Sequence, residues 1–255
     1  MLEQITPLIL TFNEQANIDR TLSGLGWAKD IVVVDSGSGD ATCEILQQHG
    51  SVRTYQRDFD SHAGQWNFGL TRTDIKTEWV LALDADYVLP NALVEEIGKL
   101  VPATATTGYQ AFFTYLVDGK ALRCSLYPPV TVLFRKIGSH YIQDGHTQRI
   151  HTSGQLEKLK VPIKHDDRKS FEHWFKSQQR YARLEAAQLR GKGFCQLNWP
   201  DKLRKCLVIT PLLVPIYLLF YKGLVLDLGK GVKYAGQRTL AEILLSREIV
   251  RTWLS

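Results

Sequence analysis

The amino-acid sequence predicts an α/β protein with a mostly parallel sheet, followed by a helical carboxyl-terminal region. Short apolar runs alternate with segments whose apolar residues recur at helical spacing, which is typical of a doubly wound sheet. Beyond residue 168 the apolar residues follow a helical pattern only. The 255 residues are enough to bury a full core. We therefore expect two regions, 1–168 and 169–255.

The expected strands begin at 8–11 and continue with the β-branched run 31–34, which is apolar on both faces. Apolar residues at helical spacing follow each strand, at 17–25 and at 42–49. The remaining strands of this region are expected at 52–56, 79–83, 132–136 and 161–164.

Polar segments follow three of these strands, namely Thr11-Phe12-Asn13-Glu14, Asp35-Ser36-Gly37-Ser38 and Asp84-Ala85-Asp86. In such sheets ligands bind beyond the carboxyl ends of the strands, so the three segments are expected to meet at one rim. Each segment also fits an ordinary structural role: the first two as turns or helix caps, and Asp84-Ala85-Asp86 as the opening of a turn. Residues i and i+2 of a strand face the same side, so Asp84 and Asp86 are expected to share one site. Such a pair suits Mg²⁺ or Mn²⁺ bound together with substrate phosphates.

Several protein classes are excluded. The loop after Val34 contains neither G-x-G-x-x-G nor G-K-[ST], which argues against a dehydrogenase and a P-loop ATPase. The four cysteines lack metal-ligand spacing and indicate reduced thiols in the cytosol, and the first residues lack the pattern of a secretory signal. The net charge of +5 is concentrated from Lys158 onward, which indicates an anionic partner.

These segments occur in a fixed order with a fourth, Phe59 to Leu70, which contains Gln65 and Asn67. Together they resemble the nucleotide-binding half of family 2 glycosyltransferases, which have the Rossmann-like GT-A fold. The similarity is greatest to bacterial transferases of the lipopolysaccharide core and of cell-surface polysaccharides. The resemblance implies an inverting enzyme that uses a nucleoside-diphosphate sugar, with a UDP-sugar as the expected donor and Mg²⁺ or Mn²⁺ as the cation.

The resemblance also implies roles for single residues. Glu14 and Asp35 would contact the nucleoside, and Gln65 and Asn67 would close over it. The other residues expected in the donor site belong to the same strand-end segments: Thr11, Asn13, Ser36, Gly37 and Ala85.

The same resemblance implies that Asp84 faces the ribose and the donor sugar, and that Asp86 holds the cation. His165 fits the position of a late metal ligand, with a structural histidine as the alternative. Arg135 ends a strand, where it would contact the diphosphate or an anionic acceptor, or be solvated.

Inversion in one displacement requires a base that takes the proton of the attacking hydroxyl. Many family members carry an acidic residue after a histidine in this region, but here Thr147 follows His146. Asp144 is therefore the expected base and His146 the alternative. An ordinary turn at Asp144-Gly145 remains a third interpretation.

The carboxyl-terminal region predicts membrane association. Residues 171–189 form a basic amphipathic pattern, which fits either a lipid surface or packing on the catalytic core. The apolar run 206–221 is short for a span and contains two prolines that should break its helix, which favours an interfacial or re-entrant hairpin. Turns are expected at Lys222-Gly223 and at Gly229–Gly231, before an amphipathic helix at 235–253.

The predicted function is sugar transfer to a lipid-linked saccharide at the cytoplasmic face of the bacterial inner membrane, by a peripheral or monotopic protein. The apolar, proline-containing run favours lipid over nucleic acid as the anionic partner. One alternative is a polyprenyl-phosphate glycosyltransferase, which needs no base because its acceptor is already an anion. The other is a non-catalytic, membrane-bound protein that binds nucleotide sugars on the same fold.

Overall fold

A computed structural model describes residues 1–144, 147–191, 193, 195, 197 and 199–254 of the chain. It consists of two compact units. The first comprises Met1–Leu116 and Leu126–Arg168. The second comprises Val117–Ser125 and Lys169–Ser255.

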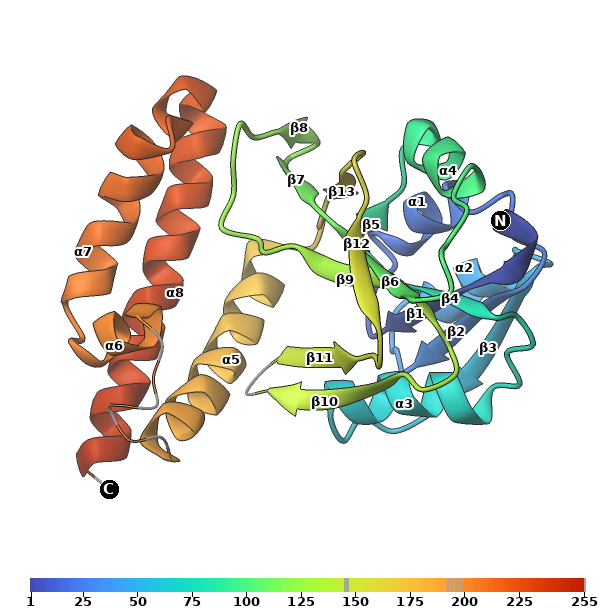
Figure 1. Cartoon of the computed structure of the whole chain (residues 1–255). Helices are drawn as coiled ribbons and strands as arrows, with labels where there is room; N and C mark the ends of the chain where they lie inside the picture. Colours follow the sequence, from blue (N-terminus) through green and yellow to red (C-terminus); the bar gives the residue numbers. More distant parts are fainter. Residues whose placement is uncertain (145–146, 192, 194, 196, 198, 255) are drawn as a thin grey trace. The chain divides into compact units, whose positions relative to one another are not determined.

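A seven-stranded sheet with the order β12-β6-β9-β4-β1-β2-β3 forms the centre of the first unit (Figure 1). All neighbouring strands are parallel except β9, which runs antiparallel to both β4 and β6. The prediction of a mostly parallel α/β sheet is therefore confirmed. The strands are β1 (Ile5–Thr11), β2 (Ile31–Asp35), β3 (Val52–Gln56), β4 (Trp79–Asp84), β6 (Thr106–Ala111), β9 (Val130–Arg135) and β12 (Gln155–Lys158).

Helices cover both faces of this sheet. Successive strand side chains point to opposite faces, so Leu8 and Ile9 of β1 enter different cores. Ile9 packs in the core with α1 (Ile18–Ser23), α2 (Thr42–Gln47) and α4 (Asn91–Gly98). Leu8 packs with α3 (His62–Arg72), which contributes Trp66 and Leu70. Burial on both faces explains why strands 5–11 and 31–35 are almost continuously apolar.

Two smaller sheets complete the strand set. One has the order β5-β13-β7-β8 and the other pairs β10 with β11. The register of β13 with β5 places His165 opposite Tyr87. These short strands are β5 (Tyr87–Val88), β7 (Phe113–Val117), β8 (Lys120–Ala121), β10 (His140–Asp144), β11 (Thr147–His151) and β13 (Ile163–His165).

The described part of the second unit consists mainly of helices, together with the segment 117–125. Its core lies between α5 (Phe171–Gly191) and α8 (Leu228–Leu254), where Ala186 and Leu245 are buried. Asp118 accepts hydrogen bonds from Lys230 and Lys233 of α8, at 2.9 and 2.8 Å. The remaining elements are α6 (Trp199–Lys205), α7 (Ile209–Ile216), the π-helical η3 (Tyr217–Tyr221) and the 3₁₀ turn η4 (Leu224–Asp227).

Two expectations for this unit are wrong. The prolines do not interrupt the helix: Pro211 lies in the first turn of α7, where its missing N–H costs no hydrogen bond, and a π-helical turn follows Pro215. Nor is there a turn at Gly229–Gly231, because α8 begins at Leu228 and includes both glycines. A Cβ on Gly231 would lie 1.9 Å from the carbonyl oxygen of Leu224, so this glycine allows a close approach of two backbones.

Among the described residues, no single helix has the length and apolar character needed to cross a bilayer. By length and composition alone, the pair Ile209–Tyr221 and Leu224–Trp253, bent by 75°, could do so together.

Candidate active site

The carboxyl ends of three strands meet at one edge of the large sheet. In the register of β1 with β2, Thr11 lies beside Asp35, and in that of β1 with β4, Leu10 lies beside Asp84. The structure therefore brings the three polar segments of the sequence together at the edge where ligands of such sheets bind.

Asp35 is 1% exposed, and its carboxylate organises the loop that follows β2. Its oxygens accept hydrogen bonds from the hydroxyls of Thr11 (2.9 Å) and Ser38 (2.5 Å) and from the backbone N–H groups of Gly37 (2.9 Å) and Ser38 (2.8 Å). Gly37 has φ +83°, a conformation that favours glycine. The structure thus gives Asp35 a positioning role in the loop, and its contact with a nucleoside remains a prediction.

Asn13 and Glu14 join this loop to the end of β1. Asn13 has φ 55°, a left-handed conformation that asparagine tolerates, and its side chain accepts from Gly39 N at 2.8 Å. Its own N–H donates to Ser38 Oγ at 2.8 Å, while Glu14 N donates to Thr42 Oγ1 at 2.7 Å. Backbone strain of this kind is common at functional sites.

Gln65 and Asn67, both on α3, make different contacts. Gln65 is fully buried and donates from Nε2 to Ser36 Oγ at 2.9 Å, so it supports the loop after β2. Asn67 binds the backbone of Tyr141 in β10, with its Nδ2 donating to the carbonyl (2.9 Å) and its Oδ1 accepting from the N–H (2.8 Å). Helix α3 therefore holds the loop after β2 through one amide and the β10–β11 hairpin through the other.

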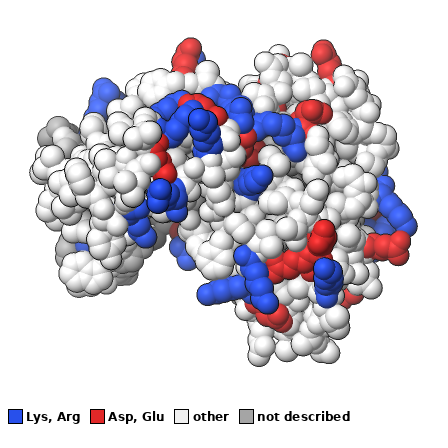
Figure 2. Space-filling model, turned by 90° about the horizontal axis from the view of Figure 1, so that it is seen from above, with Lys and Arg blue, Asp and Glu red and all other residues white. Residues whose placement is uncertain are grey.

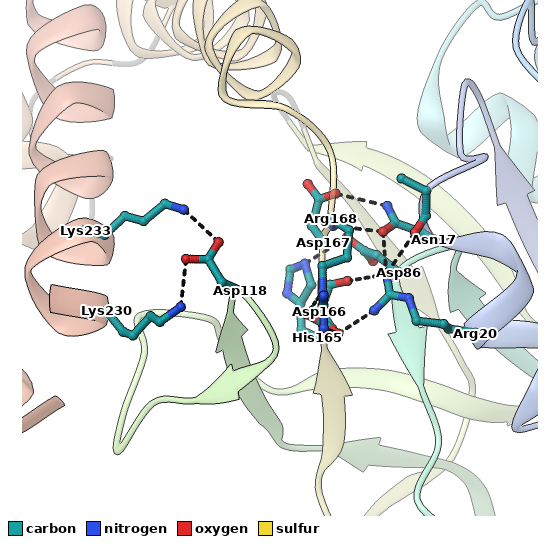
Figure 3. A network of polar contacts seen from close by, with 11 residues as sticks. Asn17, Arg20, Asp86, Asp118, His165, Asp166, Asp167, Arg168, Lys230 and Lys233 are labelled. Carbon is teal, nitrogen blue, oxygen red and sulfur yellow. Dashed lines mark hydrogen bonds and ion pairs between the residues drawn. The ribbon is translucent and has the colours of Figure 1, made fainter. Parts of the chain in front are cut away.

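Asp86 and His165 lie side by side although 79 residues separate them in the sequence. His165 Nε2 is 3.0 Å from Asp86 Oδ2, and the two side chains are 12% and 17% exposed. The antiparallel pairing of β13 with β5 produces this contact, because it places His165 opposite the residue that follows Asp86. The structure thus joins the two residues that the sequence indicated for a cation (Figure 3).

Three tyrosine rings surround the imidazole of His165. The ring centroids of Tyr127, Tyr115 and Tyr87 lie 4.5, 4.7 and 5.5 Å from that of His165. Burial lowers the pKa of His165, but the facing Asp86 carboxylate and the charge of Asp84 act the other way, so the pKa lies above its usual value. Burial and the nearby Asp84 also raise the pKa values of Tyr87 and Tyr127 well above their usual range.

The Asp86 and His165 side chains suit a divalent cation whose coordination shell a phosphate would complete. A carboxylate oxygen and an imidazole nitrogen are ligands that suit Mn²⁺, and phosphate oxygens normally supply much of the remaining shell. Among the described ranges, no group of three or more His, Cys, Asp or Glu side chains is arranged to hold a metal by itself. A cation here would therefore take the rest of its shell from water or from the substrate.

The structure corrects one of the expected donor-site residues, Arg135, and buries the side chain of another, Ala85. Arg135 ends β9, which runs antiparallel to β4, so it lies beside Trp79 at the opposite end of that strand from Asp84. There it pairs with Glu78 and stacks over the Trp79 ring at 4.7 Å. Ala85, expected among the donor-binding residues, packs in the core at 2% exposure, and its carbonyl accepts from Thr21 Oγ1 at 2.6 Å.

Of the two candidate bases, only Asp144 lies within the described residues. It ends β10, and Arg149 Nε of β11 lies 2.6 Å from its Oδ2. His146, the alternative base, lies outside the described residues. The choice of Asp144 as the base remains a prediction.

Sequence reasoning missed a polar cluster beside Asp86 and His165. In this cluster Asn17 and Arg20 bind residues 166–168 (Figure 3). It missed the tyrosines around His165 as well. The segment His165-Asp166-Asp167-Arg168 is conspicuous in the sequence, but its partners lie about 150 residues earlier. No local pattern connects the two segments.

The fold and this edge define an α/β domain of the kind that binds ligands beyond the carboxyl ends of its strands, and comparisons with known proteins give the family that it matches. Residues 8–123 match the family model described as glycosyl transferase family 2. A protein of Rickettsia bellii named "Uncharacterized glycosyltransferase" is 31% identical over 111 residues, which cover 43% of this chain and 37% of that protein. The "Lipopolysaccharide core biosynthesis glycosyltransferase LpsC" of Rhizobium meliloti is 30% identical over 104 residues, which cover 39% and 38%.

A solved structure provides the comparison of the fold. The crystal structure of S. aureus TarS 1-349 in complex with UDP-GlcNAc covers 98% of this chain and 92% of that chain, with a TM-score of 0.51 and 13% identity. The α/β architecture is thus that of GT-A proteins. The matches to the curated relatives span less than two fifths of the length of those proteins.

The chain therefore carries a domain of glycosyl transferase family 2. This confirms the resemblance that its strand-end motifs indicated.

Proposed function

We propose that the protein is an inverting glycosyltransferase that moves a sugar from a nucleoside-diphosphate sugar to a lipid-linked saccharide in cell-surface glycan biosynthesis. The observation that carries the proposal is the contact of Asp86 Oδ2 with His165 Nε2, 3.0 Å apart, at the ligand-binding edge of a family 2 domain. We take a UDP-sugar as the donor, since TarS, which has a similar fold, was crystallised with UDP-GlcNAc.

Asp86 and His165 would hold Mg²⁺ or Mn²⁺, which supplies the positive charge that a diphosphate leaving group needs. Asp84 begins the same turn and would orient the ribose and the donor sugar. Asp144 would take the proton of the acceptor hydroxyl. The hydroxyl oxygen would attack the anomeric carbon of the donor sugar as the bond from that carbon to the diphosphate breaks. One displacement of this kind inverts the anomeric centre.

The test of the donor is a thermal-stabilisation screen of nucleotide sugars with Mn²⁺. A ligand that binds only the native state raises the melting temperature, by an amount that grows with its concentration relative to Kd. We expect one nucleoside-diphosphate sugar to stabilise the protein with Mn²⁺ and much less with EDTA. A screen in which no nucleotide sugar has any effect would contradict the proposal.

The proposed site of action is the cytoplasmic face of the bacterial inner membrane, reached through the second unit. Helix α7 and η3 expose large apolar side chains: Leu212 is 66%, Ile216 57%, Phe220 71% and Tyr221 80% exposed. Lys222 follows this surface directly, and Lys202 and Lys205 lie on α6, which precedes it. Figure 2, a view from above, shows Lys and Arg side chains interspersed with Asp and Glu side chains and with wide areas of other residues. Apolar residues with adjacent cations suit anionic lipid.

A paired substitution tests this surface. Leu212→Ser with Phe220→Ser should reduce binding to liposomes that contain anionic lipid by about tenfold or more, since burying each side chain in lipid contributes about 1.5 kcal/mol or more. Val101→Ser, at a side chain 92% exposed in the first unit, is the matched control and should bind as the unchanged protein does. Full retention of the double variant on liposomes would show that this surface of α7 and η3 is not the lipid contact.

A further inference from the structure

Asn17, the residue before α1, is 1% exposed and uses every hydrogen-bonding position of its side chain. Its Oδ1 accepts from Arg20 Nη2 (2.7 Å) and from the backbone N–H of Arg168 (2.8 Å). Its Nδ2 donates to Glu14 Oε2 (2.9 Å) and to Asp167 Oδ1 (3.0 Å). One amide thus connects the loop after β1 with the segment that follows His165.

Asp166, 5% exposed, adds a second connection between the same two segments. Its carboxylate forms an ion pair with Arg20 and accepts hydrogen bonds from Nε (2.7 Å) and Nη2 (2.8 Å) of Arg168. Arg20 Nη2 also donates to the Asp166 carbonyl at 3.0 Å, and Asp166 N donates to the carbonyl of Asp86 at 3.0 Å. Figure 3 shows these side chains converging from α1 and from the end of β13.

This cluster takes the place of regular secondary structure. Strand β13 has only three residues, and the chain from Asp166 to Ser170 is neither helix nor strand. His165 is the last residue of this strand and is paired with Tyr87 of β5 and with Tyr115 of β7, whereas the chain beyond Asp166 lies outside these ladders. The bonds from Arg20 begin one residue after His165, at Asp166, and those of Asn17 begin at Asp167, so together they hold the chain that leaves the imidazole.

We propose that Asn17 is a positioning residue that holds His165 against Asp86 and fixes Glu14 in the loop after β1, so that the cation site and the nucleoside loop are assembled together before the donor binds. This inference rests on the proposed function, because it takes His165 as a ligand of the cation. Groups that orient the ligands of a metal typically change its affinity by about 10- to 100-fold when they are removed.

The variants are chosen to separate positioning from packing. Asn17→Leu keeps a similar shape and removes all four hydrogen bonds, whereas Asn17→Asp keeps both acceptor contacts and removes both donor contacts. Thr73→Val is the matched control, because Thr73 is fully buried and its hydroxyl donates one hydrogen bond, to the Gly69 carbonyl in α3. Arg20→Gln, at a side chain 31% exposed, weakens the same connection at a position that tolerates change.

Two measurements are made on the full chain: titration of Mn²⁺ in the presence of UDP, and hydrogen exchange of the 166–168 amides without ligand. We expect Asn17→Leu to bind Mn²⁺ about 10- to 100-fold more weakly and to exchange these amides faster. Arg20→Gln should show a smaller change in the same direction, whereas Asn17→Asp, whose new oxygen would face the Glu14 and Asp167 carboxylates, should change both quantities at least as much as Asn17→Leu. Thr73→Val should lower the melting temperature without changing either quantity.

Unchanged Mn²⁺ affinity and unchanged exchange in Asn17→Leu and Arg20→Gln, with only a lower melting temperature, would overturn the inference. If the unchanged protein binds neither Mn²⁺ nor UDP, the proposed function fails. The exchange rates then still decide whether Asn17 positions the end of β13.

Discussion

Helix α3 binds both the loop after β2 and the β10–β11 hairpin, but the two segments differ in how firmly their hydrogen bonds and burial fix them. The loop is fixed by a buried carboxylate, Asp35, with four hydrogen bonds, and by Gln65 beneath it. The hairpin is anchored at Tyr141, but further along β10 Ile142 is 50% exposed, and the Arg149 side chain that pairs with Asp144 is 79% exposed. Under the proposed function, the donor would meet a loop that the fold already fixes, and the acceptor would meet a more exposed hairpin.

The largest effect on turnover is expected in the β10–β11 hairpin. Asp144→Asn should lower turnover by about 10²- to 10⁴-fold, because the amide cannot accept the proton of the acceptor hydroxyl. Donor affinity should stay within a few fold, which a UDP titration measures. Asp118→Asn is the matched control, since Asp118 is also an ion-paired carboxylate but lies in the second unit. Near-normal turnover of Asp144→Asn would remove the base and favour an acceptor that is already a phosphate anion.

In the loop after β2, Asp35→Asn should lower the free energy of unfolding by about 2–4 kcal/mol and weaken UDP binding. The new amide retains one acceptor oxygen and turns an NH₂ group toward donors that Asp35 satisfied. Urea unfolding measures the change, with Asp19→Asn, at a side chain 69% exposed, as the control. A stability equal to that of the unchanged protein would show that the loop does not depend on this carboxylate.

Thr11→Val is the mildest test of the same loop. It removes one hydrogen bond, from Thr11 Oγ1 to Asp35 Oδ1, without changing the shape of the side chain, and should cost about 1 kcal/mol. UDP affinity should change by only a few fold, because three other donors still hold Asp35. An affinity loss as large as that of Asp35→Asn would mean that the hydroxyl itself contacts the nucleotide.

The donor side could be predicted from the sequence because its residues follow strands directly. Asp35 and Asp84 come at the ends of apolar runs, and parallel pairing places such ends together. The neighbour of Asp86 could not be derived in this way, because His165 reaches it through two short strands of a separate sheet. The polar cluster of Asn17 depends on the same long-range placement.

The error at Arg135 has a different cause. A run such as Val130–Arg135 shows that a strand is present but not in which direction it runs beside its neighbours. Since β9 is antiparallel to β4, its carboxyl end lies at the edge away from the site. Gly231 was misjudged for a comparable reason: its need for a close backbone approach is a tertiary feature, and in the sequence it looks like a helix breaker.

The most direct test of the central claim is a calorimetric titration with UDP, with Mn²⁺ or with EDTA, of the unchanged protein and of Asp86→Ala. We predict that binding by the unchanged protein requires Mn²⁺, and that Asp86→Ala weakens it by about 100-fold or more, because a cation contributes several kcal/mol at a phosphate site. Equal UDP affinity of the two proteins in Mn²⁺, or equal binding by the unchanged protein in Mn²⁺ and in EDTA, would contradict a cation-dependent nucleotide site at this edge of the sheet.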